Sequence, residues 1–385
     1  MARKFRLCGA AFLIVLVMAP APVVLAAARR VSAAACRSWV HTKSPNAGTS
    51  DNNLYGVTAK SARNVWAVGA YFVGVSTKTL IERWNGKSWS KVRSPNKDTG
   101  DTLYAAYAVS ATNVWAVGSY YNGTAGRTLI EHWNGKSWKV VPSPNVGAGT
   151  NEVFSVRGTS AHDIWAVGET VTSYPTTTTL VLHWNGHRWR IVPSPSVPNE
   201  PNFLNAVRPL SPSNAWAVGH YVKGTVSKTF ILHWTNGHWR IVPSPNAGTM
   251  ANELRGVLAT SATNAWAVGD YYNGTDDKTL ILHWNGHHWA RSVSPNVGTL
   301  SNDLSAIGAT SSTNAYAVGV TFTGSSSKAL IVHWNGKHWK AVPGRNPGSA
   351  DNELTAVFAL SPTSIWVVGT YNNGGHNRTL IEHCR

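Results

Sequence analysis

A repeat with a period of close to 50 residues constrains this chain more than any other feature. The motif VWAVG, or a close variant, recurs with its aromatic residue at Trp66, Trp115, Trp165, Trp216, Trp266, Tyr316 and Trp366. The intervals are 49, 50, 51, 50, 50 and 50 residues, so residues 36–385 hold seven units. Periods of this length are typical of solenoids, propellers and other arrays in which each unit packs on its neighbours.

Each unit has the pattern of four short strands. In residues 101–145 the segments TLYAAYAVS, VWAVGSYY, TLIEHW and KSWKVV are separated by ATN, NGTAGR and the hairpin signal Asn134-Gly135. Prolines then stop the fourth strand. So small a sheet, apolar on both faces, must stack on others. The sequence therefore predicts an all-β fold, a seven-bladed β-propeller with four antiparallel strands in each blade.

The two ends of the repeat array complement each other. The last unit stops at RTLIEHCR and lacks its fourth strand, whereas the first begins with CRSWVHTKSPN, which has the pattern of a fourth strand. We therefore predict that residues 36–46 pair with the last blade and close the ring. In a complete unit the third and fourth strands form one hairpin, and here the chain is interrupted at its turn. Cys36 and Cys384 lie on either side of this interruption, and we predict a disulfide between them.

The motif VWAVG…TLIEHWNGxxW resembles the repeat of exported bacterial propellers, a group related loosely to kelch and galactose-oxidase-like propellers. The resemblance covers residues 36–385 and implies the fold rather than an activity. The chain lacks the Gly-Gly doublet of kelch repeats, the Asp box of sialidases and the Trp-Asp ending of WD40 blades. It has no spare cysteine for the copper site of galactose oxidase. No cofactor is therefore expected.

The N-terminal segment differs from the repeats. Arg3, Lys4 and Arg6 precede an apolar run, and Ala26-Ala27-Ala28 offers a cleavage site. We expect a signal peptide at 1–28, a short linker at 29–35 and the propeller at 36–385. An uncleaved anchor is the alternative. Because no second apolar segment follows, we expect a secreted, monomeric protein with no membrane span after cleavage.

The tryptophan and histidine columns of the repeat are expected to be structural. The 19 tryptophans fall into three columns of the repeat, and one per blade in the same register is typical of blade-to-blade packing. A histidine column lies on the third strands, where adjacent copies are about 10 Å or more apart, too far to share a metal ion. Its members are His132, His183, His233, His283, His333 and His383.

Polar columns are expected on one face of the ring. An asparagine stands before the first strand at Asn52, Asn151, Asn202, Asn252, Asn302 and Asn352. It is followed by an acid at Glu152, Glu253, Asp303 and Glu353. Cations before the third strand are Lys78, Arg127, Lys228, Lys278, Lys328 and Arg378. These columns have two interpretations. The side chains stabilise turns and form weak ion pairs on the surface, or they form a polar mouth that binds an anionic or polyhydroxylated ligand.

Departures from the repeat suggest a functional sector. The residue after the WAVG motif is ionisable in three consecutive units, at Glu169, His220 and Asp270. The nearby segment PSVPNEPNF adds Glu200 and extra prolines. An acid–His–acid cluster can orient a sugar hydroxyl or act as acid and base. Strand ends near solvent also tolerate any side chain, so the same residues are compatible with no role.

Apart from the repeat, the sequence contains no recognisable catalytic motif. We expect a binding protein rather than an enzyme, one that recognises a carbohydrate, a cell-wall polymer or a protein at the cell surface. The net charge of +17 favours acidic partners, such as anionic cell-surface polymers, and an exported chain is a poor candidate for nucleic acid. The alternatives are a polysaccharide lyase or hydrolase with its site on the loop face, and a passive adhesion scaffold.

Overall fold

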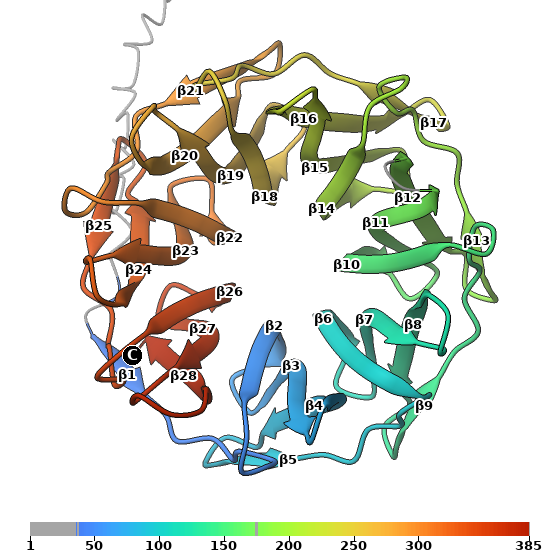
Figure 1. Cartoon of the computed structure of the whole chain (residues 1–385), viewed down its shortest axis with the longest axis vertical. Coiled ribbons are helices and arrows are strands. Elements are labelled where there is room, and N and C mark those ends of the chain that lie inside the picture. The colour runs from blue at the N-terminus through green and yellow to red at the C-terminus, as the bar shows by residue number, and fades with distance from the viewer. Residues whose placement is uncertain (1–35, 37, 174–175, 385) are drawn as a thin grey trace, which may run out of the picture. The chain divides into compact units, whose positions relative to one another are not determined.

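The computed structural model describes residues 36, 38–173 and 176–384. The expected signal peptide and linker lie outside these residues. The described chain forms seven four-stranded antiparallel sheets, which stand around a central opening like the blades of a propeller (Figure 1). The predicted fold is therefore confirmed. No described segment forms a helix long and apolar enough to cross a bilayer.

The strands occupy four positions from the channel outwards. The inner strands are β2 (Asn52–Ser61), β6 (Thr99–Ser110), β10 (Thr150–Ser160), β14 (Asn202–Ser211), β18 (Asn252–Ser261), β22 (Asn302–Ser311) and β26 (Asn352–Ser361). The second strands are β3 (Asn64–Val73), β7 (Asn113–Tyr121), β11 (Asp163–Ser173), β15 (Asn214–Lys223), β19 (Asn264–Tyr272), β23 (Asn314–Phe322) and β27 (Ser364–Tyr371).

The third strands are β4 (Ser76–Trp84), β8 (Gly126–Trp133), β12 (Thr176–Trp184), β16 (Val226–Thr235), β20 (Asp277–Trp284), β24 (Ser327–Trp334) and β28 (Arg378–Cys384). The outer strands are β5 (Trp89–Lys91), β9 (Trp138–Val140), β13 (Trp189–Ile191), β17 (His238–Ile241), β21 (Trp289–Ser292), β25 (Trp339–Val342) and β1 (Trp39–His41). We number the blades 1 to 7 in the order of their inner strands.

The ring closes as the sequence predicts. Strand β1 pairs with β28, with Trp39 opposite Cys384, so the seventh blade is assembled from both ends of the described chain. Cys36 and Cys384 form a disulfide with their Cα atoms 5.6 Å apart. The bond joins residues separated by 348 positions in sequence.

Tryptophans fill the space between blades. Trp66 of blade 1 is fully buried and lies 5.1 Å from Trp133 and 5.3 Å from Trp138 of blade 2, measured between ring centroids. Trp165 contacts the next blade in the same way. Edge and tilted contacts of this kind add to the free energy of burying the rings. The tryptophan columns therefore hold the blades together.

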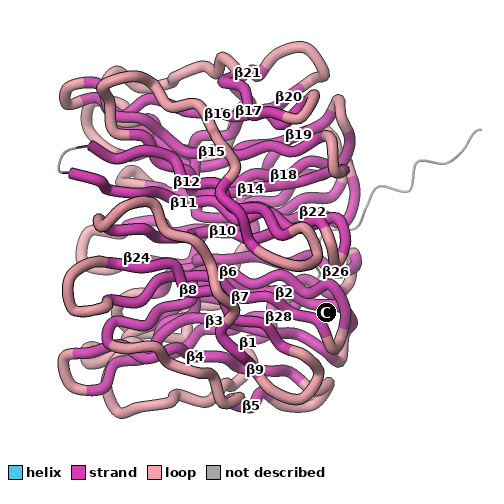
Figure 2. Tube along the Cα trace, turned by 90° about the vertical axis from the view of Figure 1, so that its right-hand side faces the viewer, coloured by secondary structure: helices cyan, strands magenta, loops and turns pink. Residues whose placement is uncertain are grey.

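Loops gather on two opposite faces of the ring (Figure 2). The inner strands all begin at one face, which we call the entry face, because the loop from the preceding blade enters there. They end at the other face, which we call the exit face, in short turns such as the one between Ser61 and Asn64. A side chain near the start of an inner strand thus lies near the entry face.

Candidate ligand-binding site

A cavity of about 250 Å³ lies between the inner strands and is lined by residues from all seven blades. Each inner strand has a register shift just after its first leucine or valine, as between Leu54 and Gly56 in β2. The extra residue of such a bulge has no partner in the ladder and re-aims its side chain. In this protein the extra residues line the cavity, and they are Tyr55, Tyr104, Phe154, Asn205, Arg255, Ser305 and Thr355.

One side of this wall is aromatic. Tyr55, Tyr104 and Phe154 come from three consecutive blades, and their ring centroids are 5.9 and 5.4 Å apart. Burial raises the pKa of Tyr104 to about 12, so its phenol is neutral. The other side is polar, because the bulge residues of the remaining four blades are Asn205, Arg255, Ser305 and Thr355. Figure 1 shows β6, which carries Tyr104, across the opening from β18 and β22.

A network of charged side chains lies on the polar side, toward the entry face. Arg255 donates from Nε to Asp270 at 2.7 Å, and its Nη2 lies 3.0 Å from Glu253. Glu253 also lies 4.0 Å from Nε2 of His220 in the preceding blade. The structure therefore joins two of the predicted residues, His220 and Asp270, through Glu253 and Arg255.

Burial sets the protonation of this network. The pKa of His220 is lowered by burial, an effect that the charge of Glu253 only partly offsets, so the ring is neutral at pH 7. Burial, together with the nearby carboxylates of Asp270 and Asp277, raises the pKa of Asp303 to about 7. One buried oxygen of Asp303 has no hydrogen-bond partner among the described residues.

The third predicted residue, Glu169, lies in a different pair. It stands opposite Glu152 in the β10–β11 ladder. Burial and the charge of Glu152 raise its pKa to about 7. Glu152 in turn accepts a hydrogen bond from Ser119 of the preceding blade at 3.2 Å. Glu200 lies in the loop before β14, where its backbone carbonyl accepts a hydrogen bond from Asn202, and Glu353 is exposed.

The asparagine column is enclosed in the entry loops. Asn52 is fully buried; its Oδ1 accepts from the backbone N–H of Ala47 at 2.7 Å, and its Nδ2 donates to the carbonyl of Ser50 at 2.6 Å. Asn151 and Asn252 bond both ends of their amides in the same way. These amides close the loops, and their hydrogen-bonding groups are used internally.

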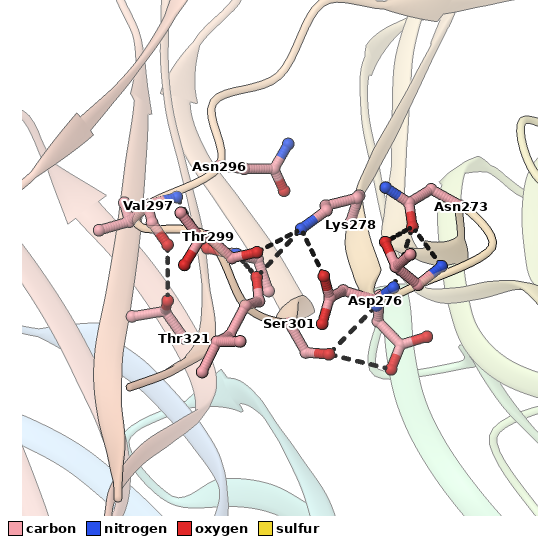
Figure 3. Close-up of polar contacts among 12 residues, drawn as sticks. Asn273, Asp276, Lys278, Asn296, Val297, Thr299, Ser301 and Thr321 are labelled. Atoms are coloured by element: carbon pink, nitrogen blue, oxygen red, sulfur yellow. Dashed lines mark hydrogen bonds and ion pairs between the residues drawn. The ribbon is translucent and has the colours of Figure 1, made fainter. Parts of the chain in front are cut away.

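The cation column clamps the loop that enters the next blade. Lys278 donates to the carbonyls of Thr299 and Leu300, both at 3.2 Å, and lies 3.6 Å from Asp276 (Figure 3). Arg127 reaches three carbonyls, and Lys78 reaches one. Lys228, Lys328 and Arg378 occupy the same position at the start of their third strands, opposite Tyr221, Thr321 and Tyr371.

The histidine column is occupied within its own blades. His233 lies 3.0 Å from Oδ1 of Asn214 and stacks on Trp216 with ring centroids 4.0 Å apart. His132, His283 and His333 have the equivalent asparagine partner. No group of three or more potential ligands is placed to hold a metal ion within residues 36, 38–173 and 176–384.

Sequence reasoning missed Arg255 and the aromatic side of the cavity. Their positions depend on the bulge, which a strictly alternating strand pattern does not contain. A signal was present nonetheless, because Arg255 is the one charged residue in a column otherwise composed of Tyr, Phe, Asn, Ser and Thr.

No protein-family model matches this sequence, and no curated protein matches it. Solved structures match in fold. YCF48 bound to D1 peptide has a TM-score of 0.52 at 15% identity, over 90% of this chain and 97% of that one. YCF48 from Cyanidioschyzon merolae has a TM-score of 0.55 at 12% identity, over 90% and 98%. A polysaccharide lyase, ulvan lyase bound to -[GlcA(1-4)Rha3S]-, has a TM-score of 0.54 at 10% identity, over 89% and 95%. At these identities the likeness shows the fold alone.

Proposed function

We propose that this protein is a secreted, non-enzymatic binding propeller that recognises a carbohydrate at the entry-face mouth of its channel. The observation that carries the proposal is the two-sided wall of the cavity. Tyr55, Tyr104 and Phe154 offer aromatic faces, and the Arg255 network lies across from them. A sugar ring has apolar C–H faces and hydroxyl edges, so it complements such a wall.

The size and charge of the mouth narrow the ligand. A cavity of about 250 Å³ is slightly below the usual range of small-molecule pockets, about 300–1,000 Å³, and suits one sugar ring or a chain end. The described residues that line the cavity include three arginines and no carboxylate, whereas the strand ends at the entry face carry Glu152, Glu169, Glu253, Asp270 and Asp303. At this mouth a neutral or amine-bearing sugar is therefore favoured over a polyanion, although the whole chain is basic. The disulfide supports an oxidising, extracellular location.

The test is a binding screen of the full chain against glycans and cell-wall polymers, followed by titration of each ligand found. Tyr104→Ala removes an aromatic face, and Asp270→Asn removes a charge from the network. Each is expected to weaken binding about tenfold, which corresponds to about 1.4 kcal/mol. Lys91→Ala, on an exposed outer strand, is the control and should leave the affinity unchanged.

Three outcomes contradict this proposal. Equal and small effects of all three variants would place the ligand elsewhere. Binding of a basic peptide but of no glycan would indicate protein recognition, as in the structure of YCF48 bound to D1 peptide. Release of shortened oligosaccharides during the screen would favour the lyase or hydrolase alternative, in which Asp303 or Glu169 serves as the acid or base.

A further inference from the structure

Two arginines line the end of the same cavity that lies toward the exit face. Arg157 and Arg208 come from adjacent inner strands and stand at the same register, opposite Trp165 and Trp216. Both line the cavity and are half-buried. They lie three residues beyond the bulge, or about 10 Å further toward the exit face at the rise of a β-strand.

Their hydrogen-bonding groups are largely unused. Nη1 of Arg157 donates to the carbonyl of Ala106 at 2.6 Å, which fixes this side chain against the neighbouring blade. Arg208 makes no hydrogen bond or ion pair with any described residue, and its buried Nε has no partner. A buried, unpartnered guanidinium costs free energy unless something else binds it.

The surroundings supply little negative charge. Burial and the positive charge of Arg208 lower the pKa of Arg157 to about 10. The other residues at this register are Thr58, Tyr107, Leu258, Gly308 and Phe358, none of them acidic. The carboxylate of Asp163 acts on Tyr107, whose pKa is raised by burial and by this charge, and it is itself held by His183 at 2.7 Å and by Thr159. Two like charges therefore lie on adjacent strands without a counterion among the described residues.

Arg208 is also accessible from the exit face. It lines a second hollow of about 390 Å³ together with Thr260, Ser261, Thr310 and Ser311. The walls of this hollow thus carry hydroxyl groups, and the described residues that line it include no carboxylate. An anion that enters from the exit face meets Arg208 without passing the acidic mouth.

We infer that Arg157 and Arg208 form a second binding site in the channel, for an oxyanion such as a sulfate or phosphate group. The fork of N–H groups on Arg208 binds two oxygens of the anion, as guanidinium groups do with tetrahedral oxyanions. The phenol of Tyr107, at the same register in blade 2, is close enough for the charges of both arginines to act on it, and its hydroxyl donates a further hydrogen bond to the anion. The channel then has an acidic mouth for neutral sugar and a basic end for an anionic group. This inference does not depend on the proposed function.

The experiment is calorimetric titration of the full chain with sodium sulfate and sodium phosphate, at ionic strength matched with sodium chloride to separate binding from screening. Arg208→Gln is expected to weaken binding at least about tenfold, and Arg208→Lys less, because it keeps the charge but loses the fork. Arg190→Gln, on the exposed outer strand β13, removes the same charge and should change nothing.

Two further measurements keep the test decisive. In chloride buffer Arg208→Gln should melt at the same temperature as the original protein or higher, because it removes an unpartnered charge. If that variant fails to fold, Tyr107→Phe tests the site by removing only a hydroxyl, with an expected loss of about threefold. Asp270→Asn should leave sulfate binding unchanged, which separates this site from the one at the mouth.

The source of the anion follows from comparing inorganic sulfate with glucose 6-sulfate, and inorganic phosphate with glucose 6-phosphate. Tighter binding of the sugar esters indicates an anionic group carried on a glycan, and equal binding indicates a free ion; both support the site. The inference is overturned if the original protein shows no heat beyond that of chloride. It is also overturned if Arg208→Gln and Arg190→Gln bind sulfate equally well.

Discussion

Two regions of this molecule use their polar groups differently. The first, which we call the repeated shell, consists of the asparagine and histidine columns that recur from blade to blade. There Asn252 bonds both ends of its amide, and His233 bonds Asn214. The second, the channel wall, consists of side chains that differ between blades, on the inner strands and on the second-strand ends beside them. Here Arg208 and Asp303 keep buried polar atoms without a partner in the described part of the chain.

This difference separates scaffold from site. A satisfied polar group stabilises the fold and has nothing left to offer a ligand. An unsatisfied one costs stability, and functional sites are where proteins tolerate that cost. Substitutions in the shell should therefore change the free energy of unfolding, and substitutions in the wall should change binding. The predictions below test this division in order of decreasing effect.

The largest effect is expected at the seam where the shell is closed. Cys36→Ser combined with Cys384→Ser removes a cross-link between residues 348 positions apart. In the chain-entropy account, so long a loop stabilises the fold by about 5 kcal/mol through the unfolded state. Urea denaturation of the oxidised protein and the double variant measures the loss. Addition of a reductant should lower the stability of the original protein alone.

A smaller loss is expected from a single amide. Asn252→Asp replaces the Nδ2 donor, which bonds the carbonyl of Gly248 at 2.9 Å, by an oxygen that repels it. The expected cost is about 3 kcal/mol at pH 7, because the new carboxylate is buried. Asn285→Asp is the matched control: this exposed asparagine uses only its Oδ1, as an acceptor from two backbone N–H groups. Equal costs for the two variants in urea denaturation would contradict the structural role of the column.

The shell was also the part that the sequence could predict. Blade number, strand order, the pairing of residues 36–46 and the disulfide all follow from the period and from its two incomplete ends. The channel wall could not be predicted to the same extent. Its geometry depends on a bulge that adds one residue to each inner strand, and on contacts between blades such as that of His220 with Glu253. Neither has a local sequence signature.

One buried third-strand position carries glutamate in three blades, as Glu82, Glu131 and Glu382, and leucine or valine in the others. Glu82 is fully buried there, and burial raises its pKa to about 8. The folded state thus holds a proton that the unfolded state releases above about pH 4.5. Stability should fall as the pH rises from about 5 to above 8.

Glu82→Leu should remove part of that fall. We expect a gain of about 2 kcal/mol at pH 8.5 and a smaller gain at pH 5, because the charged carboxylate is buried at a cost that the nearby Ser44 hydroxyl offsets only in part. Urea denaturation at the two pH values measures the difference. A variant that is less stable at both values would show that the carboxyl group is satisfied by water or by an internal hydrogen bond.

The smallest effect on stability is expected in the channel wall, and it has the opposite sign to the losses expected for the disulfide and Asn252 variants. Glu169 and Glu152 stand side by side, and the pKa of Glu169 is raised to about 7 by burial and by its neighbour. The contribution of Glu169 to stability is therefore lost as the pH rises through 7, and Glu169→Gln removes this part of the pH dependence. The expected gain is about 0.5 kcal/mol at pH 8 and close to zero at pH 5, since the partly exposed pair is screened by solvent. Glu200→Gln, in the loop before β14, should change stability at neither pH.

If Glu169→Gln stabilises the fold and also weakens glycan binding, the Glu152–Glu169 pair contributes to ligand binding and lowers the stability of the fold. If it lowers stability, Glu169 belongs to the shell, and the division between the two regions fails at this blade.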